Sequence, residues 1–89
     1  MTSELLIGYL IYIWPMQQYI YEDQYRGKPR KLLILTPSDG TAYRVFCDAD
    51  FLGSITPIAD EQAGIIWKTE YNILKPIAAK IGQYIESKI

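Results

Sequence analysis

The chain has 89 residues and a formal net charge of −1, so we expect one small domain over residues 1–89. A slightly acidic domain lacks the general attraction to phosphate on which nucleic-acid binders depend. Histidine is absent and Cys47 is the only cysteine. Within one chain this excludes zinc sites of the usual nitrogen and sulfur type, disulfides, and catalytic serine or cysteine paired with histidine. We therefore expect no enzyme activity, no metal and no cofactor.

The first segment with a clear character is ELLIGYLIYIWPM, residues 4–16, which carries no charge after Glu4. As a helix, the uncharged part would cover about 18 Å, against about 30 Å of bilayer hydrocarbon, so no membrane span is expected. Gly8 and the many β-branched and aromatic residues favour a buried strand over residues 5–14, with a short buried or interfacial helix as the alternative. Both faces of that strand are apolar, and the C-terminal helix can cover only one. A second copy would cover the other, which predicts a homodimer.

The middle of the chain is typical of short antiparallel strands joined by turns. Residues 26–31, RGKPRK, are expected to form the first connecting turn, and PSDG supplies turn chemistry further on. A hairpin turn is expected at residues 48–50, and Pro57 is expected to close the strand that returns from it. The expected strands span about residues 17–25, 31–36, 42–47 and 51–57, with 65–68 either a brief strand or the approach to the helix.

The C-terminal stretch has apolar residues at the three- and four-residue spacing of an amphipathic helix, over about residues 73–88. Asn72 is a candidate N-cap, and proline fits only in the first turn, so the helix is expected to begin between Ile73 and Pro76. The predicted fold is therefore α+β: an antiparallel sheet of four or five strands with one C-terminal amphipathic helix packed on one face.

Tyrosine and tryptophan are more numerous than one small helix-covered core requires. These residues pack well within sheets, but they also dominate the energetics of protein interfaces. We weigh the two interpretations evenly, and both can hold in a homodimer. The candidate interaction residues on this aromatic sheet face are Tyr9, Tyr12, Trp14, Tyr19, Tyr21 and Trp67.

Basic residues are concentrated in RGKPRK, close to several tyrosines, an arrangement that can contact phosphate and stack on bases. The alternative is a solvated hairpin loop whose charges keep a sheet edge from pairing with other chains. Glu22 and Asp23 partly cancel the patch, so we favour the solvated loop and expect no measurable affinity for oligonucleotides at physiological salt. The candidate phosphate contacts are Arg26, Lys28, Arg30 and Lys31.

Two further features have structural interpretations. Cys47 alternates in phase with apolar residues of its strand, which predicts a small buried hydrophobic side chain rather than a reactive thiol. Residues 48–50 begin a weak likeness to a calcium loop, but Leu52 and Ala59 stand where such a loop needs oxygen ligands.

Together these features predict a small cytosolic protein-interaction module, a regulator or inhibitor of a larger protein, that acts through an aromatic sheet face. The alternative is a nucleic-acid-binding accessory protein that uses the basic loop 26–31. The cytoplasm is expected because the chain has a single cysteine and its Met-Thr-Ser-Glu start has no features of a secretory signal.

Overall fold

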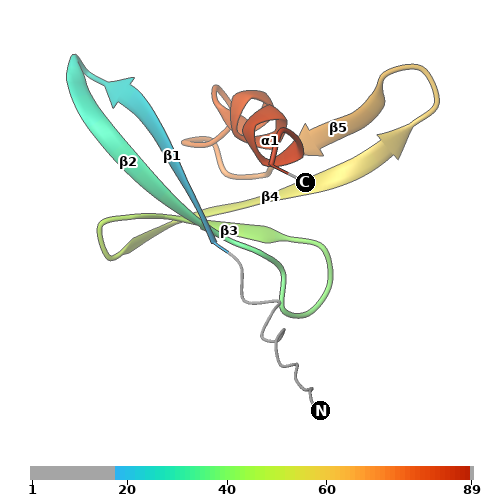
Figure 1. Cartoon of the computed structure of the whole chain (residues 1–89), viewed down its shortest axis with the longest axis horizontal. Coiled ribbons are helices and arrows are strands. Elements are labelled where there is room, and N and C mark those ends of the chain that lie inside the picture. Colours follow the sequence, from blue (N-terminus) through green and yellow to red (C-terminus); the bar gives the residue numbers. More distant parts are fainter. Residues whose placement is uncertain (1–17, 89) are drawn as a thin grey trace, which may run out of the picture.

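The computed structural model describes residues 18–88. Five strands form one antiparallel sheet in the order β1-β2-β3-β4-β5, and one helix follows them (Figure 1). The predicted α+β fold is therefore confirmed, whereas the strand expected over residues 5–14 lies outside the described residues. The elements are β1 Gln18–Tyr25, β2 Lys28–Leu35, β3 Tyr43–Cys47, β4 Asp50–Asp60, β5 Gly64–Lys68 and α1 Ala78–Glu86.

The turn between β1 and β2 contains only two residues. Arg26 and Gly27 have φ angles of 54° and 79°, both in the left-handed region, so Tyr25 pairs directly with Lys28. Two such residues in succession suit the twist of a tight hairpin, and glycine accepts this conformation without steric cost. The sequence-based assignment of all of residues 26–31 to a loop is therefore corrected, because residues 28–31 belong to β2.

The longest strand, β4, divides its pairing between two neighbours. Its residues 50–55 pair with β3 and its residues 56–60 pair with β5. Pro57 was expected to end this strand, but it lies inside β4 beyond the last residue that pairs with β3. Its missing N–H therefore removes no hydrogen bond to β3.

The extension of β4 leaves only residues 61–63 between β4 and β5. The carboxylate of Asp60 orders this loop, since its Oδ2 accepts hydrogen bonds from the backbone N–H groups of Gln62 (3.1 Å) and Ala63 (2.8 Å). An aspartate that binds the backbone two and three residues ahead mimics a turn. The connection between β4 and β5 is therefore a short, ordered hairpin turn.

The core lies between α1 and the concave side of the curled sheet. In Figure 1, the β1–β2 hairpin and the β4–β5 hairpin stand on either side of α1. The helix contacts β1, β4 and β5, so it spans the opening between the two ends of the sheet. None of the helical residues between positions 18 and 88 makes a segment long and apolar enough to cross a membrane. The buried core side chains are Leu32, Ile34, Val45, Ile55, Leu74, Ala78, Ile81 and Ile85.

The helix α1 begins at Ala78, later than the range expected from the sequence. The preceding residues form tight turns, in which the N–H of Leu74 donates to the carbonyl of Tyr71 (2.9 Å) and the N–H of Ile77 donates to the carbonyl of Leu74 (3.0 Å). Pro76 has no N–H with which to continue a helical ladder. Ile77 therefore occupies the N-cap position, without a side-chain hydrogen bond, in place of the predicted Asn72.

Candidate interaction surface

The described aromatic residues of the predicted interaction face lie on the inner side of the sheet. Tyr19 and Tyr21 are half-buried and pack against the core. The ring of Tyr21 contacts the ring of Tyr84 from α1 edge-on, with centroids 5.5 Å apart. Among the other predicted interaction residues, Tyr9, Tyr12 and Trp14 lie outside residues 18–88. The inner tyrosines therefore help to join β1 to the helix.

Trp67 joins β5 to the helix in the same way. Its indole meets the ring of Tyr43 edge-on, with centroids 5.3 Å apart, and its Nε1–H donates to Oε2 of Glu86 at 2.5 Å. Gly82 of α1 presents bare backbone to the indole, because a methyl group at this position would lie 2.1 Å from the ring. Burial in this cluster raises the pKa of Tyr43 above its ordinary value, and Tyr19 raises that pKa further.

A row of apolar side chains crosses the opposite, outer face of the sheet. Ile20 of β1 pairs with Leu33 of β2, Leu33 pairs with Phe46 of β3, and Phe46 pairs with Phe51 of β4. The rings of Phe46 and Phe51 lie 5.4 Å apart, and Phe51 meets the ring of Tyr71 edge-on at 5.9 Å. We call this row the outer stripe: Ile20, Leu33, Phe46, Phe51 and Tyr71.

Two local irregularities bring Phe51 and Tyr71 into the outer stripe. The register between β3 and β4 shifts at Val45 and Phe46, and this bulge places Phe51 opposite Phe46. Gly53 then has a φ angle of 144°, and a methyl group there would lie 2.3 Å from the ring of Tyr71. Only glycine allows the tyrosine ring to lie this close to the strand backbone.

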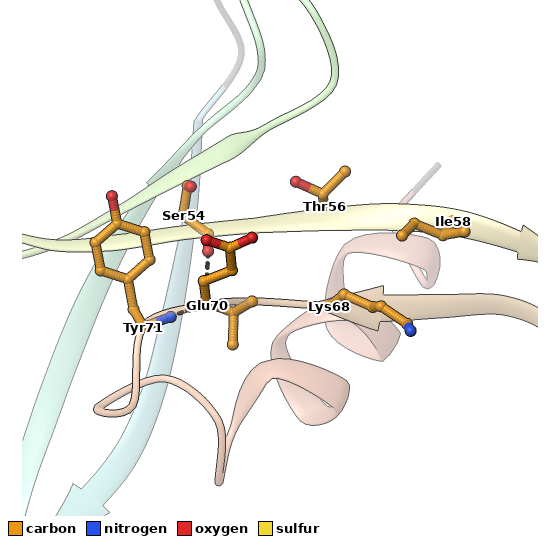
Figure 2. Close-up of a pocket in the computed structure, with 7 residues that line it drawn as sticks. Ser54, Thr56, Ile58, Lys68, Glu70 and Tyr71 are labelled. Atoms are coloured by element: carbon orange, nitrogen blue, oxygen red, sulfur yellow. Dashed lines mark hydrogen bonds between the residues drawn. The ribbon is translucent and has the colours of Figure 1, made fainter.

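The hydroxyl of Thr69 fixes the loop that carries Tyr71. It donates a hydrogen bond to the carbonyl of Ser54 (2.7 Å) and accepts one from the N–H of Tyr71 (3.0 Å) (Figure 2). The strand edge of β4 is thus occupied by a side chain just where pairing with β5 stops. This contact holds the Tyr71 ring beside Phe51.

A shallow groove of about 520 Å³ begins at Tyr71 and follows the outer side of β4 and β5. Figure 2 shows that Ser54, Thr56 and Ile58 project from β4, while Lys68 and Glu70 lie along the neighbouring segment. Hydroxyl, ammonium and carboxylate groups therefore border one end of the apolar outer stripe. An apolar centre beside a polar rim is the usual anatomy of a protein-binding surface.

The basic residues of the first hairpin differ in the contacts that they make and in the face of the sheet to which they point. Nε and Nη2 of Arg30 donate to the two carboxylate oxygens of Asp23 at 2.9 and 2.6 Å, and this hydrogen bonding raises the pKa of Arg30. The guanidinium groups of Arg30 and Arg26 both lie over the ring of Tyr25, at 4.4 and 5.2 Å from its centroid.

Lys28 and Lys31 are both exposed, but they point to opposite faces of β2 because their positions in the strand differ by an odd number. The structure therefore brings Arg26 and Arg30 together on Tyr25, and it does not gather the four predicted phosphate contacts on one surface.

Comparisons with known protein families, curated proteins and solved structures found no match to this chain. Within residues 18–88, no three side chains are grouped so that they could hold a metal ion. The outer stripe combines exposed apolar side chains with a polar border, so we take it as the candidate interaction surface.

Sequence reasoning did not select any residue of the outer stripe as a site, although a partial signal was present. Alternation along the strands already places Phe46 opposite the core face, and the same rule places Ile20 and Leu33 outward. No such signal exists for Phe51 and Tyr71. Their positions depend on the bulge and on the contact between Tyr71 and Gly53.

Proposed function

We propose that this chain is a small cytoplasmic, non-catalytic interaction module whose outer stripe binds a protein partner. The observation that carries the proposal is the exposure of Ile20, Phe51 and Tyr71, at 43%, 50% and 42%, within one contiguous apolar row. Removing such a row from water stabilises a complex. Three of its five side chains, Phe46, Phe51 and Tyr71, are aromatic, and aromatic residues are enriched at protein interfaces.

A role as a regulator or inhibitor of a larger protein fits this surface. The inner face of the sheet packs against α1, so a partner can bind the outer face without unfolding the core. The non-catalytic part of the proposal rests on composition, because a chain without histidine has few groups for acid–base or nucleophilic chemistry.

The matched pair Ile20→Ser and Ile65→Ser tests the proposal. Both isoleucines lie on edge strands and are similarly exposed, at 43% and 49%, but they lie on opposite faces. A pull-down from native lysate, after nuclease treatment, should recover a partner with the unmodified chain and with Ile65→Ser. Recovery should fall with Ile20→Ser and disappear when Phe51→Ser is added. Equal recovery by all variants, or equal loss by both single variants, would contradict the proposal.

The homodimer expected from residues 5–14 stays a prediction, since that segment lies outside the described residues. A second copy of the chain is one protein that could bind the outer stripe. Light scattering over a concentration series tests it, because a homodimer dissociates on dilution whereas an intramolecular contact does not.

A further inference from the structure

The N-terminal segment joins the sheet directly beside the outer stripe. Gln18 is the first described residue, and its outer-face row continues through Leu35 and Arg44 to Ser54. This row lies next to the outer stripe, two residues along each of the first three strands. The residues that precede Gln18 are therefore attached at the border of the exposed apolar surface.

The segment of residues 4–16 has the length and the chemistry to cover that surface. Its thirteen residues reach roughly 43 Å when extended and about 20 Å as a helix. The outer stripe crosses four strands, a width of only about 14 Å. The segment also has no charge after Glu4, so covering the stripe with it buries no unpaired ionic group.

We propose that residues 4–16 occupy the outer stripe of their own chain, and that a partner binds there by displacing them. A segment tethered at Gln18 has an effective concentration in the millimolar range, far above that of a second copy at micromolar protein. Residues 4–16 of the same chain are therefore favoured over a second copy as the occupant of the outer stripe. The first part of this proposal, occupancy of the outer stripe by residues 4–16, depends only on the stripe and on the sequence of that segment. The second part, displacement of the segment by a partner, rests on the proposed function.

Tryptophan fluorescence of the full chain tests occupancy. The substitution Trp67→Phe leaves Trp14, inside the segment, as the only tryptophan. At low micromolar protein, Trp14 emission should be blue-shifted, and acrylamide should quench it several-fold less than in a peptide of residues 4–16. When Ile20→Ser and Phe51→Ser are added to the Trp67→Phe chain, quenching of Trp14 should rise to the level seen in the peptide. Adding Ile65→Ser instead should leave Trp14 protected. If circular dichroism shows that the double variant is unfolded, Tyr71→Ser provides a second variant of the outer stripe, since Tyr71 lies in a loop.

Three results would overturn occupancy. The first is quenching of Trp14 equal to that of the peptide. The second is protection of Trp14 from acrylamide that appears only at concentrations where light scattering detects a dimer. This result would mean that a second copy of the chain covers the stripe. The third is protection that the stripe variants leave unchanged, which would show that the segment binds elsewhere, for example along β1.

Displacement has a separate readout. Once a partner has been identified, its affinity can be measured for a chain that carries both Ile11→Ser and Ile13→Ser. These substitutions weaken the binding of residues 4–16 to the outer stripe, so the affinity for the partner should rise several-fold. Unchanged or reduced affinity would overturn displacement. Because Trp14 quenching requires no partner, a failure of the proposed function leaves the occupancy result intact.

Discussion

The indole of Trp67 lies directly on the backbone of Gly82, with room for a hydrogen atom but not for a methyl group. This contact brings β5 and α1 together, and the hydrogen bond from Trp67 to Glu86 fixes the orientation of the ring. A glycine inside a helix ordinarily weakens it by about 1 kcal/mol relative to alanine. Here the glycine allows a close contact between the helix and the last described strand.

Replacing Gly82 by alanine should therefore destabilise the domain, although alanine favours a helix. An added methyl group in a filled site costs about 1–3 kcal/mol. Urea unfolding of the variant measures this loss. Trp67→Phe, which has a smaller ring, should reduce the cost of Gly82→Ala in a double-mutant cycle. Strictly additive effects would show that the close contact is not the cause.

The ion pair between Asp23 and Arg30 should stabilise the first hairpin more than an ordinary surface pair. Both side chains are partly buried, at 14% and 13% exposed, and the pair is bidentate. Arg30→Lys removes the planar fork and the contact with Tyr25, and should cost about 1 kcal/mol in thermal or urea unfolding. Lys28→Arg, on the same strand and exposed, should be neutral. The prediction is contradicted if the two substitutions have equal effects.

The division of the basic residues between two faces sharpens the nucleic-acid test. Reversing the charge of Arg30 would place two carboxylates together and disturb the hairpin, so Lys28→Glu with Lys31→Glu is the cleaner variant. We expect no measurable oligonucleotide affinity at physiological salt for the unmodified chain. A micromolar complex that weakens by about 0.7 log units per log unit of salt for each phosphate contact, and that this variant abolishes, would favour the nucleic-acid alternative.

The raised pKa of Tyr43 predicts a loss of stability in base. The folded state holds the Tyr43 proton above the ordinary pKa of 10.0, whereas the unfolded state releases it near that value. Above pH 10 the unfolded state therefore binds fewer protons, and the free energy of unfolding falls until the folded pKa is passed. Urea unfolding between about pH 9 and 11.5 should show a shallower fall for Tyr43→Phe. An identical pH dependence for both proteins would contradict this assignment.

The strands and the turns between them could be predicted because their signals are local. Alternation in residues 42–47 and turn residues at 48–50 predict a hairpin, and the structure contains it, with β3 ending at Cys47 and β4 beginning at Asp50. The helix was predicted from the spacing of its apolar residues, but its first residue was not. The same apolar spacing also covers the tight turns around Pro76 that precede the helix, so spacing alone does not show where the helix begins. Pro57 was misleading for a related reason, since its effect depends on where pairing with β3 stops.

The candidate site was harder to predict because it depends on which face of the sheet the helix covers. Trp67, Tyr19 and Tyr21 resemble interface residues in composition, but the curled sheet turns them toward α1. Phe51 and Tyr71 reach the outer face through a bulge and a glycine contact between distant residues. Neither relationship is visible in a pattern of neighbouring residues.

Half of the core comes from the end of the chain, which has a consequence for biosynthesis. Leu74, Ala78, Ile81 and Ile85 are four of the eight buried core side chains within the described residues. Every strand pairs with its neighbour in sequence, so the hairpins can form as the chain emerges from the ribosome. Until residues 74–85 follow, however, the inner side of the nascent sheet has no cover. A chain that is cut short after Lys68 and released would therefore expose a curled sheet with both faces apolar, a natural target for chaperones.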